Sequence, residues 1–298
     1  MTVSLKLGED DSLEKTEVTT QATIIWENFR RHKIAVIASV LFILLAAACF
    51  AAPWVAPYKF DAINLSAIKR PPSAGHWMGT DDLGRDLLTR ILYGGRISIM
   101  IGILSAIVGS GLGALIGAMA GYYGGRLDNI LMRFTDIAYS IPTLPLLIVL
   151  GSFSNSSVPI MVIIIGFLSW MPTARVVRGS VLSVKEKEYV ESARMIGAPD
   201  WVIITQHILP NIAGPIIVGA TLGVGNAIII ESSLSFLGLG VQPPTPTWGN
   251  MLMDSQSTMA SKPWLTIFPG MAILLIVLAV NFIGDGLHDA LDPTLRRR

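Results

Sequence analysis

Charged residues are scarce in this sequence. Only 14% of its 298 residues are Asp, Glu, Lys or Arg, whereas 52% are hydrophobic. Soluble domains carry about 25% charged residues. The shortage excludes a disordered chain, an ordinary soluble enzyme and a nucleic-acid-binding protein. It indicates instead a polytopic membrane protein that contacts the lipid bilayer.

The sequence also has only one cysteine, almost no net charge and no pattern typical of a signal peptide. A single cysteine, Cys49, can form neither an intrachain disulfide nor a cysteine metal cluster, and we expect it to be buried as a small apolar residue. The net charge of +1 selects no partner. Residues 7–17 are acidic where the start of a signal peptide would be basic, so we expect no such peptide.

Long stretches without charge are abundant. A transmembrane helix needs about 20 mostly apolar residues. The sequence predicts six such helices, which form a transmembrane domain over 34–284, between an N-terminal segment 1–33 and a C-terminal tail 285–298. The expected spans are residues 34–52, 97–120, 130–151, 158–174, 212–232 and 263–284. The fold class is therefore an all-α polytopic membrane helix bundle.

The distribution of basic residues predicts the orientation of this bundle. Six spans place both termini on one side. The segments on that side hold 15 Lys and Arg and the opposite segments hold 7, six of them in 54–96. Because cytoplasmic segments are the richer in basic residues, we expect both termini in the cytoplasm.

A ladder of glycines runs through the second expected span. Its members recur at every fourth position and therefore share one helix face. Small residues on such a face allow close contact with a neighbouring helix in a membrane, so we expect this face to pack tightly against another span. The ladder consists of Gly109, Gly113, Gly117, Gly121 and Gly125.

Ionisable residues within the spans are few. Glu231 and Asp136 lie near span ends, so we expect them at the level of the lipid headgroups. A proton-driven or sodium-driven carrier would be expected to hold acids in mid-span. An intramembrane enzyme would need grouped catalytic or metal-binding residues, whereas the four histidines are isolated from one another. We therefore expect no catalytic residue, no metal site and no cofactor. The histidines are His32, His76, His207 and His288.

Residues 79–86 are close to a phosphate-binding loop, but Arg85 and Asp86 replace its Lys and Ser/Thr, and its aspartates would repel phosphate. We interpret the segment as the start of a surface helix, capped by Thr80 or Asp81. In this interpretation Asp86 pairs with Arg90 four residues later. The helix would end at Gly94 and Gly95.

Most connections between helices have 2–8 residues. The segment 185–210 is much longer than such a connection requires. Lys185 to Ile196 is predicted to be a helix, with Tyr189, Ala193 and Ile196 on one face. Gly197 suits its C-terminal cap. Asp200 is the expected N-cap of a second helix toward Pro210. We interpret this segment as a docking element for a cytoplasmic partner.

The segment is similar in sequence to a known motif. Glu191-Ser-Ala193, followed by Gly197 and by Ile208-Leu209-Pro210, resembles the EAA motif of ATP-binding cassette (ABC) importer permeases, with Ser192 in place of an alanine. Further patterns resemble the dipeptide/oligopeptide/nickel class of these permeases. They are residues 26–31, 79–86, 121–125, 237–240, 242–249 and 284–293.

The resemblance implies a type I ABC importer permease fold in the bacterial inner membrane, with residues 185–210 as the loop that couples to an ATPase. The implied coupling residues are Glu191, Ser192, Ala193, Arg194, Gly197, Ile208, Leu209 and Pro210. The implied partners are a second homologous permease chain, two cytoplasmic ATP-binding subunits and an extracytoplasmic substrate-binding protein. The chain itself would not be an enzyme. Its implied cargo is a dipeptide or oligopeptide; a glutathione-like peptide, nickel or another small solute remains the alternative, and an ion-driven secondary carrier is disfavoured.

Overall fold

The computed structural model describes residues 21–153 and 157–291, and within these ranges the chain is helical, with no β-strand. Short 3₁₀ segments and one π-helical segment join the α-helices. The α-helices are α1 (Gln21–Arg31), α2 (Lys33–Phe50), α3 (Ala52–Val55), α4 (Leu87–Tyr123), α5 (Gly125–Ser140), α6 (Thr143–Ser152), α7 (Val158–Phe167), α8 (Trp170–Val184), α9 (Glu188–Met195), α10 (Asp200–Val202), α11 (Ala213–Phe236), α12 (Trp248–Ser255) and α13 (Trp264–Leu291).

The described helices give four to six candidate spans, where the sequence predicts six. Four stretches are long and apolar enough to cross a membrane, and the pairs α5–α6 and α7–α8 qualify as two more if each bent pair counts as one span. The bends are 80° in the first pair and 44° in the second. In the first pair, Ile141 is extended in front of Pro142, because a residue before proline is disfavoured in the helical conformation.

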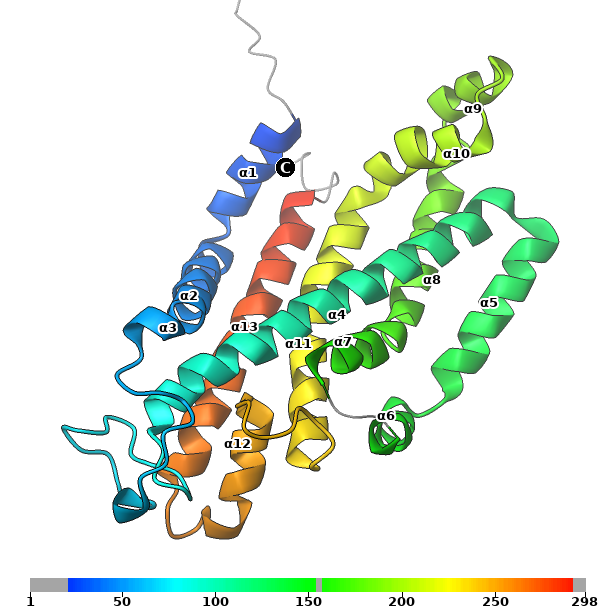
Figure 1. The fold of residues 1–298 in the computed structure, drawn as a ribbon. Helices are drawn as coiled ribbons and strands as arrows, with labels where there is room; N and C mark the ends of the chain where they lie inside the picture. Colours follow the sequence, from blue (N-terminus) through cyan, green and yellow to red (C-terminus); the bar gives the residue numbers. More distant parts are fainter. Residues whose placement is uncertain (1–20, 154–156, 292–298) are drawn as a thin grey trace, which may run out of the picture.

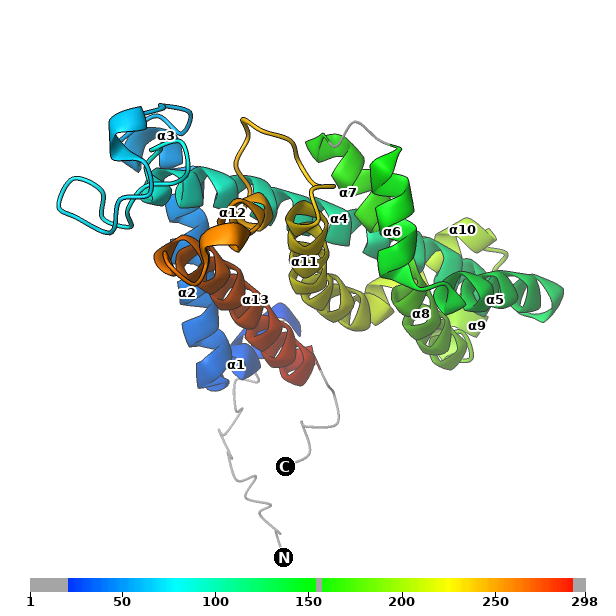
Figure 2. The ribbon, with the colours of Figure 1, turned by 90° about the horizontal axis from the view of Figure 1, so that it is seen from below.

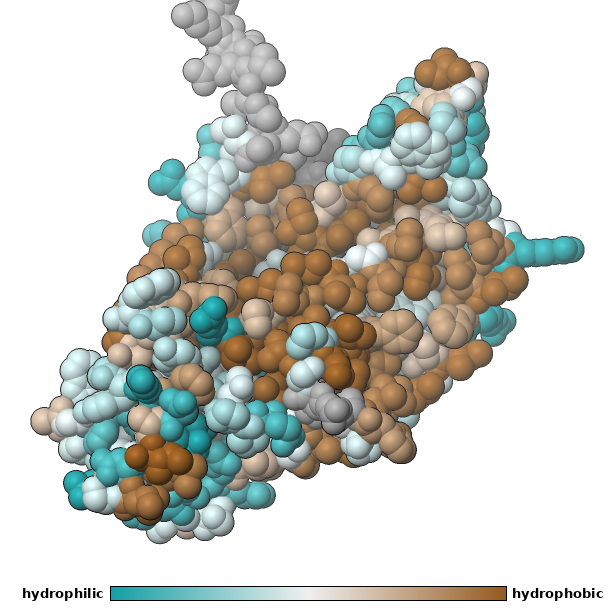
Figure 3. All heavy atoms as spheres, in the orientation of Figure 1, coloured by the Kyte–Doolittle hydropathy of each residue, from teal (hydrophilic) through white to brown (hydrophobic). Residues whose placement is uncertain are grey.

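The bundle has α4 and α11 at its centre. Figures 1 and 2 show α2 and α13 on one side of α11, and α5, α6 and α8 on the other. The loop that carries α9 and α10 lies at one end of the bundle, together with the beginning of α1 and the end of α13, whereas α3 and α12 lie toward the opposite end (Figure 1). In Figure 3, hydrophobic side chains form a broad band between two more hydrophilic ends, as a bilayer-spanning protein requires.

The helix α4 is much longer than the expected span 97–120. Its 37 residues correspond to about 55 Å of helix, whereas the hydrocarbon core of a bilayer is about 30 Å thick. It packs against α2, α7, α8 and α11. A single helix thus runs from one end of the bundle to the other.

The glycine ladder of α4 packs against α8 of the same chain. A Cβ atom at Gly113 would lie 2.6 Å from the Cβ of Thr173, and one at Gly121 would lie 2.8 Å from the Cβ of Val181. A Cβ at Gly109 would lie 3.0 Å from the Cβ of Ser169, and one at Gly117 would lie 2.9 Å from the Cβ of Val177. The fifth member, Gly125, begins α5 with a positive φ of 57° and has open space around it, so the close contact ends at Gly121.

The interpretation of residues 79–95 as a separate surface helix is wrong. Asp86, and not Thr80 or Asp81, caps α4: its Oδ2 accepts a hydrogen bond of 2.8 Å from the amide of Thr89. The helix continues through Gly94 and Gly95 because these glycines mark close packing. A Cβ at Gly95 would meet the sulfur of Cys49 and lie 2.5 Å from the ring of Trp248, while one at Gly94 would lie 3.3 Å from the backbone of Thr247.

The expected ion pair between Asp86 and Arg90 is also wrong. The second oxygen of Asp86 lies 2.9 Å from Nδ1 of His76. Arg90 instead lies with its Nε 3.3 Å from Oδ2 of Asp81 and with Nη2 3.9 Å from Oδ2 of Asp254 on α12. One oxygen of Asp86 is thus bound to the amide of Thr89 and the other to His76, so neither pairs with Arg90.

Candidate functional site

The loop between α8 and α11 is folded around a tight glycine turn. Gly197 follows α9 with φ +81°, a left-handed conformation that favours glycine. The amide of Ala198 donates to the carbonyl of Ala193 over 3.1 Å, and the amide of Gly197 donates to that of Arg194 over 3.0 Å. These two bonds form a Schellman motif, as expected for a glycine cap. A Cβ at Gly197 would have nothing within 4 Å, so its backbone conformation is what favours glycine there.

Both helix starts in this loop differ from the prediction. The first helix, α9, begins at Glu188 and not at Lys185, and Asp200 is the first residue of α10 and not its N-cap, which is Pro199. The side chains of Lys185 and Asp200 are both bound to the end of α4. Lys185 Nζ donates to the carbonyl of Gly121 over 2.9 Å, and Asp200 Oδ1 accepts from the hydroxyl of Tyr122 over 2.7 Å.

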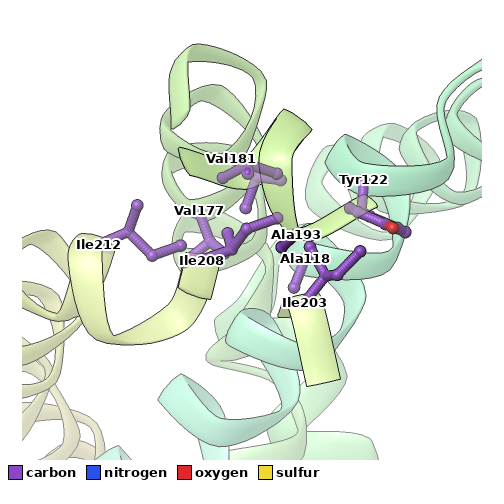
Figure 4. Close-up of a cluster of buried hydrophobic side chains, with 9 residues drawn as sticks. Ala118, Tyr122, Val177, Val181, Ala193, Ile203, Ile208 and Ile212 are labelled. Atoms are coloured by element: carbon purple, nitrogen blue, oxygen red, sulfur yellow. The ribbon is translucent and has the colours of Figure 1, made fainter. Parts of the chain in front are cut away.

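A hydrophobic cluster holds this loop against the ends of α4 and α8 (Figure 4). We call it the loop seat. It consists of Ala118, Tyr122, Val177, Val181, Val190, Ala193, Ile203, Ile208 and Ile212. Five of its members are fully buried: Val177, Val181, Val190, Ile203 and Ile208. Because packed interiors transmit displacement and are hard to compress, the seat joins the loop firmly to two long helices.

The opposite face of the loop exposes large apolar side chains around the glycine turn. Ile196 is 85% exposed, Met195 75% and Trp201 64%. Such a patch on a protein surface marks an interaction site. We call these three residues the loop tip.

The structure divides the predicted coupling residues between these two faces. Ala193 and Ile208 are buried in the loop seat and Leu209 is half-buried, while the others are exposed. The exposed ones are Glu191, Ser192, Arg194, Gly197 and Pro210. The predicted face of Tyr189, Ala193 and Ile196 does not exist as one surface, since Ala193 points inward.

Sequence reasoning missed Met195 and Trp201 as surface residues. The signal that could have indicated them is their position: apolar side chains flank a glycine turn on both sides, where the helices that precede and follow the turn are too short to bury them.

An ion pair supports the base of the loop. Arg178 on α8 donates from Nε and Nη2 to the two carboxylate oxygens of Asp128 on α5, over 2.6 and 2.5 Å. Two parallel bonds of this kind fix the orientation of both side chains. The base of α8 is thereby tied to α5 as well as to α4.

Residues with catalytic or metal-binding chemistry do not gather in the described part of the chain, where no group of three or more His, Cys, Asp or Glu could hold a metal ion. Glu231 lies inside the protein: it is fully buried, among the hydroxyl groups of Ser98, Ser232 and Ser235. Asp136 is exposed and pairs with Arg175 over 2.7 Å.

Known proteins are similar to this sequence over almost its full length. Residues 113–297 match the family described as binding-protein-dependent transport system inner membrane component, and residues 20–72 match the N-terminal TM domain of oligopeptide transport permease C. The glutathione transport system permease protein GsiD of Pectobacterium atrosepticum is 44% identical over 272 residues, which cover 91% of this chain and 90% of that protein. GsiD of Escherichia coli O6:K15:H31 and GsiD of Shigella boydii are each 42% identical over 284 residues, covering 94% of this chain and 93% of theirs.

These matches include the whole of the loop, its seat and the first membrane helix. They place the chain in the same class as the permeases for dipeptides, oligopeptides and nickel, in the bacterial inner membrane. The chain belongs to the binding-protein-dependent transport system inner membrane component family and is a permease subunit of an ABC importer.

Proposed function

We propose that this permease imports peptides and forms half of the translocation pathway, with a second homologous permease chain as the other half. The support for the cargo is the name of its relatives, which are glutathione permeases, together with the match to an oligopeptide permease domain. Glutathione is itself a small peptide. A substrate-binding protein outside the membrane delivers the peptide to the end of the bundle that carries α12.

The loop tip is the surface to which we assign the cytoplasmic ATPase subunit. The observation that carries this assignment is the contrast between the two faces of the loop: Ile196, Met195 and Trp201 are exposed while Ala193 and Ile208 are buried in the seat. Exposed apolar groups on a rigid support favour a complementary protein surface. The sequence of the loop resembles the EAA motif, which in this type of permease contacts the ATPase.

The proposed cycle requires no chemistry from the permease itself. Two ATPase subunits close when they bind ATP, and each displaces the loop that it holds. The loop seat passes this displacement to α8 and to the end of α4. These helices then change the access of the pathway from one side of the membrane to the other.

The docking assignment is tested with two matched substitutions. Ile196→Asp places a charge in the loop tip without disturbing the fold, because the side chain is 85% exposed. Trp77→Asp makes a similar change at a residue that is 73% exposed and lies in the segment between α3 and α4. We expect Ile196→Asp to abolish co-purification of the ATPase subunits and Trp77→Asp to retain it. Normal co-purification with Ile196→Asp would contradict the docking role.

The cargo is tested with the complete transporter in proteoliposomes. Dipeptides, oligopeptides, glutathione and Ni²⁺ are each supplied with the binding protein, and uptake and ATP hydrolysis are measured. We expect peptides, including glutathione, to be taken up and to stimulate hydrolysis. Uptake of Ni²⁺ alone would replace the peptide assignment, and uptake driven by an ion gradient without ATP would overturn the mechanism.

A further inference from the structure

The inner end of α4 is attached to the coupling loop by a directional bond as well as by packing. The hydroxyl of Tyr122 donates to Oδ1 of Asp200 over 2.7 Å, and the guanidinium of Arg194 lies 5.7 Å from the centre of the Tyr122 ring. Asp200 and Arg194 stand on the two sides of Gly197, so α4 contacts both arms of the glycine turn. Tyr122 itself is only 8% exposed.

The outer end of the same helix is attached to the opposite end of the bundle. Asp86 caps α4, and Arg90 in its first turn lies between Asp81 and Asp254 of α12. Between these ends α4 is one unbroken helix of 37 residues. Its glycine face lies so close to α8 that the two helices have little freedom to separate. A displacement of the loop therefore reaches the outer end of α4 without an intervening hinge.

We propose that Tyr122 and Asp200 are positioning residues that fix α4 to the coupling loop, residues 185–210, so that α4 and the loop move together. This inference rests on the proposed docking of the ATPase at the loop tip. Hydrophobic packing in the loop seat resists compression but is non-directional, whereas a hydrogen bond holds two groups at one distance and angle. The Tyr122–Asp200 bond, beside that of Lys185 to the carbonyl of Gly121, supplies a fixed point that packing alone lacks.

Four single substitutions separate this role from a general structural one. Tyr122→Phe and Asp200→Ala remove the hydrogen bond. Asp200→Asn is the conservative variant, since its amide oxygen still accepts from the tyrosine hydroxyl. Tyr123→Phe is the matched control: the neighbouring side chain is 52% exposed, and its hydroxyl has no hydrogen-bond partner within the described residues.

The measured quantity is the number of substrate molecules transported per ATP hydrolysed by the complete transporter in proteoliposomes. We expect Tyr122→Phe and Asp200→Ala each to lower this ratio about fivefold, the equilibrium factor of one typical protein hydrogen bond. The double variant is expected to be no worse than either single one. Tyr123→Phe and Asp200→Asn are expected to keep the wild-type ratio, and all variants are expected to co-purify with the ATPase.

The outcomes distinguish this inference from the proposed function. An unchanged ratio in Tyr122→Phe and Asp200→Ala would overturn the inference, as would equal losses in Asp200→Asn and Asp200→Ala. Loss of ATPase co-purification in Tyr122→Phe would assign the residue to docking and would also overturn it. Failure of the unmodified chain to bind the ATPase would refute the proposed function instead.

Discussion

The carboxylate of Glu231 on α11 accepts a hydrogen bond of 3.1 Å from the hydroxyl of Ser98 on α4, a residue 133 positions earlier in the chain. The other carboxylate oxygen accepts from Ser235 over 2.7 Å. The oxygen of Ser98 in turn accepts from the amide of Trp248, the first residue of α12, over 3.3 Å. The buried acid Glu231 thus connects α4, α11 and α12.

Glu231 is expected to stabilise this junction through its hydrogen bonds. In Glu231→Leu the hydroxyls of Ser98 and Ser235 lose their acceptor, and a buried polar group without a partner costs about 1–3 kcal/mol. Glu231→Gln keeps an amide oxygen in place and should cost less. Thermal unfolding of the purified permease in detergent measures both. Equal stability of Glu231→Leu and the unmodified protein would contradict the role.

The glycine ladder gives a prediction with an internal control on the same helix. A Cβ at Gly117 would lie against the carbonyl oxygen of Ala174 and 2.9 Å from the Cβ of Val177, whereas one at Gly111 would have nothing within 4 Å. Gly117→Ala should therefore force α4 and α8 apart and destabilise the protein by about 1–3 kcal/mol. Gly111→Ala should stabilise it by about 0.5–1 kcal/mol, because alanine favours a helix.

Unfolding of the two alanine variants in detergent is the direct test of this packing. Opposite changes in stability are expected. A shift of the same sign for both positions would show that the ladder has no special contact with α8.

The ladder also shows what sequence alone could predict. Its four-residue spacing indicated a close helix contact, and the contact exists, but periodicity identifies a face and not the neighbour. Gly94 and Gly95 were misread for a related reason: glycine is common both at helix ends and at close contacts, and only the position of Trp248, more than 150 residues away, decides between them.

The position of the loop and its glycine turn were predicted from sequence, whereas its docking role stays a prediction. The length of residues 185–210, the glycine and the motif all indicated a docking loop. The division into a buried seat and an exposed tip could not be predicted, because the side of the loop that Ala193 faces depends on Val177 and Val181 of α8. The hydrogen bond of Asp200 was missed since its partner, Tyr122, lies 78 positions away.

Two neighbouring residues of the loop are expected to respond differently to the same substitution. Ala193 is 5% exposed in the loop seat, so Ala193→Arg would bury a charge and overpack the cluster. Overpacking alone typically costs about 1–3 kcal/mol. Ser192 is exposed, and Ser192→Arg should leave the stability of the permease unchanged.

The same pair of variants separates the seat from the docking surface. Ala193→Arg is expected to lower both the unfolding temperature of the permease in detergent and its ATPase coupling. Ser192→Arg can affect only the contact with a partner. Normal unfolding of Ala193→Arg would show that the loop does not depend on its seat.

The orientation of the bundle in the membrane is the last expectation, and it rests on charge. The 15 basic residues on the side of the termini, against 7 on the other, predict that α9 lies in the cytoplasm and α12 outside. The beginning of α1 and the end of α13 lie at the same end of the bundle as α9 (Figure 1), in agreement with an even number of crossings.

Cysteine labelling in intact cells tests this orientation. Cys49 is buried and is first replaced by serine to give a background without thiols. Ser257, after α12, and Ser192, in α9, are both exposed, so each is suited to replacement by cysteine. Ser257→Cys should react with an impermeant thiol reagent in intact cells, and Ser192→Cys only after lysis. The reverse pattern would place the loop outside the cell, where no ATPase could reach it.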